Sequence, residues 1–179
     1  LLLYTRFWEF DVRDAVAALA GIVAVRPDAH LLVVGKGERG EEQELLRLAT
    51  RAGLAASIDY RGWTEPAQLP DVLASADVAL VPMDDTLINR ARGLAKLLEL
   101  MALGLPIVAA RVGQVDEYLN GGKCGRLVPP GDPGALAREV LTLLGDPGAA
   151  RDLGRCAQQR AWNEYSWARL AVVAEQAYQ

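Results

Sequence analysis

Two cations and a carboxylate in this sequence have the types and spacing that suit a ligand carrying phosphates and hydroxyls. Lys96 and Glu99 lie three residues apart, so in a helix they share one face of its first turns. Arg6 follows a short apolar segment, and a guanidinium matches the geometry of phosphate oxygens. The cations would bind a diphosphate, and the carboxylate would bind the hydroxyls of a ribose. Taken alone, Arg6 is more simply explained as a solvated loop residue.

A strand, loop, helix and strand pattern positions two of these charges. An apolar run from Val78 to Pro82 precedes a polar loop, a helix from Leu94 to Leu103 follows, and Ile107 to Ala110 form the next strand. This βαβ pattern predicts a parallel sheet. Its loop delivers residues to the carboxyl end of a strand and the N-terminus of a helix, where such sheets bind ligands and anions are favoured.

The rest of the chain continues the alternation of strands and helices. Further strands are expected at residues 1–4, 30–34, 57–60 and 125–128, and further helices at 12–25, 41–52, 66–75, 115–119, 133–144, 147–165 and 166–179. The fold class is therefore α/β, with a Rossmann-like parallel sheet of about six strands, flanking helices and a helical C-terminal tail. We expect a single domain over 1–179, with a core at 1–130 and C-terminal helices at 131–179. Trp162 and Trp167 are expected as anchors in the core or, as the less favoured alternative, against another domain.

A glycine-rich turn at residues 35–40 matches the pattern GxGxxG, and Asp59 follows at about the spacing of a ribose-binding acid. A dinucleotide site would place a pyrophosphate at this turn. Three glutamates stand in and just after the turn and would repel a pyrophosphate. They complement the helix dipole without any ligand. Gly35 and Gly37 therefore more simply make the turn, or let backbone approach a smaller ligand.

The sequence gives weaker indications of function for other polar and aromatic residues. Trp63 follows the third strand, where it would stack on a base or pack under its loop. Asp84 and Asp85 would be candidates for a metal ion, but no acidic cluster accompanies them at the expected edge. His30, the only histidine, begins a strand at the opposite edge, so no histidine base is expected in this domain.

Composition limits the classes of partner. A net charge of −4 argues against nucleic acid and anionic membranes as partners. No apolar run approaches the roughly 20 residues of a membrane span. Cys124 and Cys156 lack metal-ligand spacing and are expected as two buried or idle thiols in a reducing cytosol. The chain opens with three leucines and no Met, which suggests part of a longer cytoplasmic protein, peripheral to a membrane only through another domain.

Taken together, the segments resemble the C-terminal, donor-binding half of a retaining glycosyltransferase with the GT-B fold, of the group 1 or family 4 type. The resemblance covers nearly the whole chain, and its most specific segment is KLLELMALGLPIVA, which begins at Lys96. Further matching segments, in chain order, are LYTRF at 3–7, VVGKGE at 33–38, YRGW at 60–63, ADV at 76–78, VGQ at 112–114 with Glu117, GRLVPPGD at 125–132 and SW at 166–167.

The resemblance implies roles for individual residues. Arg6 and Lys96 would bind the diphosphate of a nucleotide sugar and stabilise it as it leaves. The backbone amides of Leu97 and Leu98 would assist from the helix, and Glu99 would hold the ribose hydroxyls. The loop that follows the third strand would meet the base. No metal and no other cofactor are implied.

The sequence departs from the family pattern at two positions. The family often has two glutamates with seven residues between them, but Ala91 stands where the first would be. That glutamate would have contacted the transferred sugar, so Asn89, Thr86 or Asp85 are candidates to replace it. A lysine that follows the opening arginine in the family is also absent, because Asp11 stands there.

The implied reaction transfers a sugar from a nucleoside diphosphate to an acceptor hydroxyl with retention of configuration. The acceptor, whether glycan, lipid or small molecule, would bind an N-terminal domain absent from this chain, so the chain alone should bind nucleotide without turnover. A nucleotide-sugar epimerase of the same architecture and a non-catalytic, NAD-type nucleotide-binding domain are alternatives. A signalling receiver module is disfavoured, because Arg6 stands after the first strand instead of paired acids.

Overall fold

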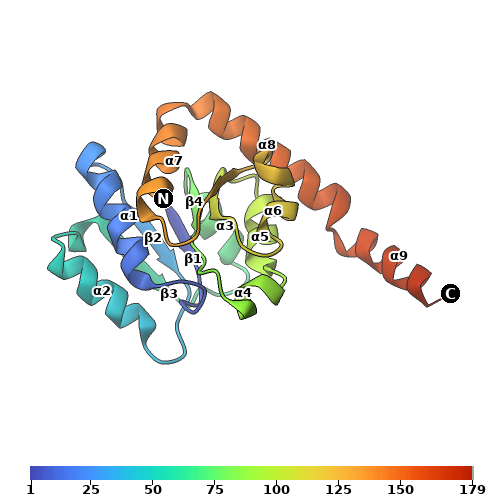
Figure 1. Ribbon diagram of the computed structural model, residues 1–179, viewed down its shortest axis with the longest axis horizontal. Coiled ribbons are helices and arrows are strands. Elements are labelled where there is room, and N and C mark those ends of the chain that lie inside the picture. Colours follow the sequence, from blue (N-terminus) through green and yellow to red (C-terminus); the bar gives the residue numbers. More distant parts are fainter. Residues whose placement is uncertain (179) are drawn as a thin grey trace.

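The chain folds around one six-stranded parallel sheet with the strand order β3-β2-β1-β4-β5-β6. The computed structural model describes residues 1–178 (Figure 1). The strands are β1 (Leu2–Tyr4), β2 (Leu31–Val34), β3 (Ile58–Gly62), β4 (Ala79–Val81), β5 (Ile107–Ala110) and β6 (Arg126–Val128). The order reverses between β1 and β4, and this is the point at which a doubly wound sheet opens a crevice for ligands. The predicted fold class is confirmed.

Helices cover both faces of the sheet (Figure 1). One face carries α1 (Val12–Val25), α2 (Glu41–Arg51) and α7 (Pro133–Gly145). The other carries α3 (Leu69–Ala74), α5 (Ala95–Ala102), α6 (Val115–Tyr118) and part of α8 (Pro147–Glu164). The remaining helices are α4 (Leu87–Ala91) and α9 (Trp167–Ala177), and short 3-10 turns occur at Ala55–Ser57 and Asn120–Gly122.

Side-chain caps explain where two helices begin. The carboxylate of Asp11 accepts a hydrogen bond from the amide of Arg13 at the start of α1, and Asp132 does the same for Ala135 at the start of α7. Such caps satisfy amides that have no partner within the helix. The predicted starts of both helices are therefore correct. The short helix α4 is a correction, because its residues lie in a segment predicted as loop.

The C-terminal tail differs from its prediction as core. Trp162 is 60% exposed and Trp167 is 88% exposed. No described residue of α9 is buried, and the helix extends away from the sheet (Figure 1). The helical prediction is correct for the described residues, with Gln179 lying outside them, but the favoured expectation that both tryptophans lie in the core is wrong. Helical periodicity identifies an apolar face without identifying what covers it.

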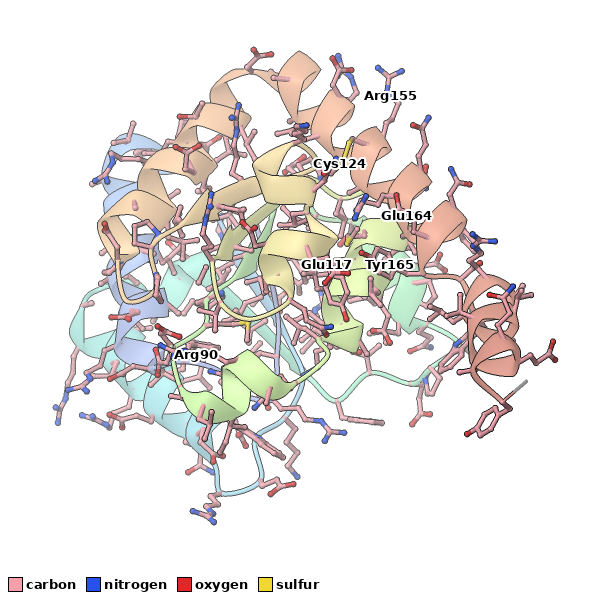
Figure 2. All side chains as sticks on the ribbon, turned by 45° about the vertical axis from the view of Figure 1, so that its right-hand side comes forward. Arg90, Glu117, Cys124, Arg155, Glu164 and Tyr165 are labelled. Carbon is pink, nitrogen blue, oxygen red and sulfur yellow. A yellow bond between two sulfur atoms is a disulfide. The ribbon has the colours of Figure 1, made fainter. Side chains whose placement is uncertain are left out.

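The two cysteines form a disulfide, so the expectation of two buried or idle thiols is wrong. Cys124, before β6, is bonded to Cys156 in α8, with their Cα atoms 5.0 Å apart (Figure 2). Their separation of 32 residues hid this pairing from the sequence. Nearby, Glu117 of α6 lies beside Tyr165 at the end of α8, and the ring of Tyr165 meets that of Tyr118 edge to face (Figure 2). These contacts fix α8 against the second face of the sheet.

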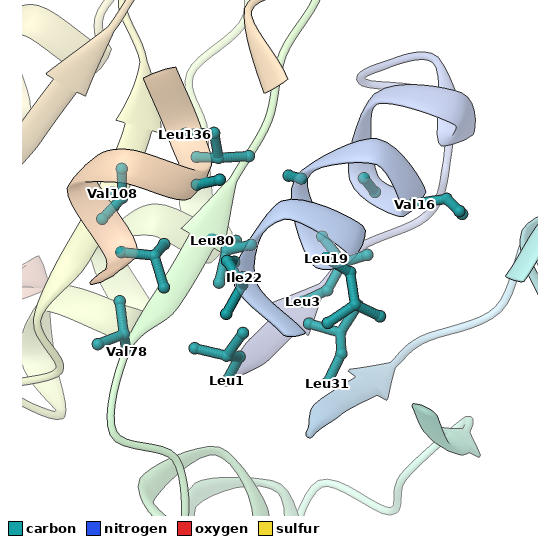
Figure 3. Packing of buried hydrophobic residues seen from close by; sticks show 14 of the residues in the cluster. Leu1, Leu3, Val16, Leu19, Ile22, Leu31, Val78, Leu80, Val108 and Leu136 are labelled. Carbon is teal, nitrogen blue, oxygen red and sulfur yellow. The ribbon is translucent and has the colours of Figure 1, made fainter. Parts of the chain in front are cut away.

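Alternating strand residues build a separate core on each face. On the first face, Leu1 and Leu3 pack with Leu19 and Ile22 of α1 and Leu136 of α7 (Figure 3). On the second face, Leu2 packs in a cluster that includes the fully buried Leu97, Leu100 and Met101 of α5. Burying a leucine side chain contributes about 1.5–3 kcal/mol. This packing holds the N-terminus of α5 at the carboxyl edge of the sheet.

None of the helices within residues 1–178 combines the length and the apolar character needed to cross a bilayer.

Candidate functional site

A cavity of about 420 Å³ opens at the carboxyl edge of the sheet, between the ends of β1, β2 and β3 and the start of α5. It is lined by Tyr4, Thr5, Arg6, Trp8, Glu9, Val34, Gly35, Lys36, Trp63, Thr64, Pro66, Leu69, Arg92, Gly93, Leu94, Ala95, Lys96 and Glu99. The lining includes Arg6, Gly35, Trp63, Lys96 and Glu99, which were predicted as site residues from the sequence. Residues almost 100 positions apart in the chain therefore meet in one cavity.

The cations and the carboxylate predicted from the sequence come together around Tyr4. The ammonium of Lys96 lies 5.4 Å from the centre of the Tyr4 ring. Burial and the adjacent Glu99 carboxylate raise the pKa of Tyr4 to about 12, so its phenol stays protonated and can donate a hydrogen bond. Arg6 lies against the ring of Trp8, 5.8 Å from the ring centre. The cavity thus offers cations, a carboxylate and a phenol to one ligand.

Glu9 is a central site residue that the sequence did not reveal. It is only 7% exposed, and its Oε2 accepts hydrogen bonds from the Thr5 hydroxyl (2.9 Å) and the Trp8 amide (3.1 Å). Its Oε1 lies 3.4 Å from Nζ of Lys96 and 3.5 Å from a guanidinium nitrogen of Arg92. No local motif signals this pairing, since 87 residues separate Glu9 from Lys96.

Burial and charge act on the pKa of both partners. Burial alone would raise the pKa of Glu9, but Lys96, the Thr5 hydroxyl and Arg92 together hold it below its usual range. Burial lowers the pKa of Lys96, and the Glu9 carboxylate opposes that shift. Each residue therefore helps the other to remain charged in a site that is partly shielded from water.

We expect Glu9→Gln to lower the free energy of unfolding by about 1 kcal/mol at neutral pH, the size of a typical net hydrogen bond. The pKa of Glu9 is lowered in the folded state, so its ionised form stabilises the fold above the unfolded-state pKa of about 4.3. This contribution is lost as pH falls through the folded pKa. Urea denaturation of both proteins at pH 7 and at successively lower pH should therefore give curves whose separation narrows as the pH falls. A separation that does not depend on pH would contradict the ionic explanation.

The glycine-rich turn already uses its amides within the protein. The amide of Gly37 donates to Oε2 of the buried Glu42 at 3.0 Å, and the amide of Arg39 donates to Glu41 at 2.8 Å. Gly35 has a φ of +123°, and a Cβ there would lie 1.8 Å from the carbonyl oxygen of Thr5. The glycine at position 35 is thus required by the protein's own backbone. A pyrophosphate at this turn would face the two glutamates.

Several other residues that were predicted for the site lie outside the lining of the cavity. Gly37, Leu97 and Leu98 do not line the cavity, and the amide of Leu97 donates to the Leu94 carbonyl at 3.0 Å. Asn89 is buried away from the cavity lining. Its Nδ2 donates to the carbonyls of Glu9 (2.7 Å) and Asp84 (2.8 Å).

Three further residues, Asp85, Thr86 and Trp63, were proposed from the sequence one at a time. Asp85 pairs with Arg90, and Thr86 caps α4 by accepting from the Asn89 amide. Trp63 is 67% exposed and lines the cavity, so it is not packed under its loop. Within residues 1–178, no group of three or more His, Cys, Asp and Glu side chains is arranged to hold a metal ion.

The family model described as "Glycosyl transferases group 1" matches residues 1–146. This chain belongs to that glycosyltransferase family. The predicted resemblance to this family is confirmed, and the chain covers about half the length of a solved glycosyltransferase, as one half of a GT-B fold would.

Curated relatives of this glycosyltransferase chain are considerably longer. The glycogen synthase of Mycobacterium tuberculosis (strain H37Rv) is 30% identical over 179 residues, which cover 99% of this chain and 42% of the relative. The phosphatidyl-myo-inositol mannosyltransferase of Mycobacterium leprae (strain TN) is 34% identical over 159 residues, covering 89% of this chain and 39% of the relative. The chain thus spans less than half the length of these relatives.

A solved structure shares the fold. HepE of Anabaena, crystallised in complex with UDP and glucose, superposes with a TM-score of 0.83 at 22% identity, covering 99% of this chain and 48% of HepE. At this identity the likeness establishes the arrangement of helices and strands. It does not assign a ligand to the cavity.

Proposed function

We propose that this glycosyltransferase chain binds the nucleoside-diphosphate sugar donor of a retaining glycosyltransferase. One observation carries the proposal: Arg6, Lys96 and Glu99 converge in one cavity at the N-terminus of α5. Within the described residues, no side chain caps that terminus. Two side-chain cations and a helix dipole of about half a charge would nearly neutralise the roughly two negative charges of a diphosphate.

The chemistry of the site follows from charge that develops as the sugar departs. As the bond from the anomeric carbon to the diphosphate breaks, negative charge grows on the leaving phosphate. Arg6 and Lys96 would stabilise that charge, which is an electrostatic form of catalysis that needs no metal ion. Glu99 and the Tyr4 phenol would hold the ribose, and Trp63 would stack on the base. The name of the Anabaena structure, a complex with UDP and glucose, supports this class of ligand.

Acceptor binding would belong to an N-terminal domain of the complete enzyme. That domain would bring the hydroxyl of a glycan, lipid or small molecule to the open side of the cavity, in the cytoplasm. The chain alone would bind nucleotide without turnover. Product analysis with the complete protein tests the reaction: retention gives a product with the anomeric configuration of the donor. Epimerised nucleotide sugar in place of a glycoside would contradict it.

Calorimetric titration of this chain with UDP, GDP, ADP and NAD at one salt concentration tests the binding role. We expect one nucleoside diphosphate to bind and NAD to give no heat, because Glu41 and Glu42 occupy the amides of the glycine turn. Binding of NAD without a response to any nucleoside diphosphate would contradict the proposal. The base preferred in this titration would identify the donor nucleotide.

A further inference from the structure

The polar groups of the cavity form three zones that follow the strand order. Trp63 comes from the end of β3, while Arg6 extends from the end of β1 beside Lys96 of α5. The third zone, made by Trp8, Glu9 and Arg92, lies toward β4. The backbone of Glu9 accepts hydrogen bonds from the Asp84 amide and the Asn89 side chain, which both follow β4.

The proposed function, on which this inference rests, places no part of the ligand in the third zone. If the base stacks on Trp63 and the diphosphate lies at Arg6 and Lys96, the sugar extends toward the third zone. Ala91, at the end of α4, does not line the cavity. The side chains that do line this end of the cavity are Trp8, Glu9 and Arg92.

Within this zone, Glu9 lies behind Arg92. The Arg92 side chain is 24% exposed, whereas that of Glu9 is 9% exposed and its Oε2 is already occupied by Thr5 and Trp8. The remaining oxygen, Oε1, faces Arg92 at 3.5 Å and Lys96 at 3.4 Å. A ligand in the cavity would therefore touch the guanidinium, while the carboxylate behind it holds the guanidinium in place and offsets its charge.

The charges of the whole cavity fit a donor whose sugar is uncharged. Its cations are Arg6, Lys36, Arg92 and Lys96, and its carboxylates are Glu9 and Glu99. Four positive and two negative side chains leave two positive charges, which match the diphosphate alone. A sugar that carries its own carboxylate would raise the negative charge of the donor from about two to three and would place the added charge beside Glu9.

We propose that Arg92, held and neutralised by Glu9, contacts the transferred sugar, and that this pair selects donors with an uncharged sugar over donors with a uronic acid. Glu9 acts as a positioning residue through Arg92. The guanidinium would donate hydrogen bonds to sugar hydroxyls. Without the Glu9 charge, the same guanidinium would become a partner for a sugar carboxylate.

Donor binding by the complete protein tests this assignment, with UDP, UDP-glucose and UDP-glucuronate, or the equivalents for the base it prefers. We expect wild type to bind the glucose donor more tightly than the glucuronate donor. In Glu9→Gln this ratio should fall by about tenfold or more, the effect of one charge-assisted hydrogen bond. The ratio is the readout because any change at the diphosphate affects both donors equally. Glu65→Gln, which removes an exposed negative charge next to the lining residues, should leave the ratio unchanged.

The variant Arg92→Gln provides a second, independent test of the assignment. It should bind UDP-glucose more weakly relative to UDP than wild type does, and it should not favour the glucuronate donor. The assignment would be overturned if a folded Glu9→Gln kept the wild-type ratio of affinities for the glucose and glucuronate donors. It would also be overturned if Arg92→Gln kept the wild-type ratio of affinities for UDP-glucose and UDP. Either result would leave the proposed donor site intact. A wild-type protein that binds no nucleoside diphosphate would overturn both proposals.

Discussion

Arg6→Ala is expected to weaken nucleoside diphosphate binding by about 10- to 100-fold and to leave the affinity for the matching nucleoside unchanged. A charge-assisted hydrogen bond contributes about 1.5–3 kcal/mol, and each 1.4 kcal/mol is a factor of ten in affinity. Arg6 lines the cavity, rests against Trp8, and makes no ion pair within the described part of the chain. Its removal therefore leaves no buried carboxylate without a partner, and the loss should appear in binding and not in stability.

Calorimetry with the diphosphate and the nucleoside separates a phosphate contact from a general disturbance. Arg39→Ala is the matched control, because it removes an exposed cation that follows β2 at the same edge of the sheet and does not line the cavity. Lys96→Ala should also weaken diphosphate binding, but it leaves the Glu9 carboxylate without its ammonium partner and should lower stability too. Equal losses for nucleoside and diphosphate in Arg6→Ala would refute the proposed contact with phosphate.

Local signals explain why most elements could be predicted from the sequence. Asp11 before an apolar repeat and Asp132 before Pro133 mark the starts of α1 and α7, and the structure contains both caps. The buried strands are short apolar runs between turn residues. These signals lie within a few residues of one another, so the order of strands and helices followed without tertiary information.

The residues of the site could be predicted only in part, because the position of Glu9 depends on the course of the loop after β1, which no local sequence pattern encodes. Phe7 adopts a left-handed φ of 69°, and its amide donates to the Thr5 hydroxyl at 2.7 Å. The loop is then fixed by Asn89, 80 residues away, through the Glu9 carbonyl. Asn89 was predicted as a candidate sugar contact. Its amide instead cross-links the loops after β1 and β4, a role visible only once both loops are placed.

Two glycines in helix interiors lead to opposite expectations for the same substitution. Gly154→Ala in α8 should lower the free energy of unfolding by about 3 kcal/mol, the upper end of the usual cost of overpacking. A Cβ at Gly154 would lie 2.1 Å from the carbonyl oxygen of Gly104, so α8 or the end of α5 must shift. In Gly21→Ala of α1, the Cβ would meet the Cβ of Ala137 at 3.4 Å, an ordinary contact. There, helix propensity should raise stability by about 0.5–1 kcal/mol.

Thermal denaturation of both variants measures this contrast. For a domain of this size, about 3 kcal/mol corresponds to a fall in Tm of roughly 6–12 °C for Gly154→Ala. Gly21→Ala should instead show a small rise in Tm. The pair matters for the site because Gly154 sets how closely α8 approaches α5, whose first two turns carry Lys96 and Glu99. A shift of α5 would weaken diphosphate binding in Gly154→Ala as well. If both variants were stabilised alike, helix propensity would dominate at both positions, and α8 could not approach Gly104 as closely as the structure shows.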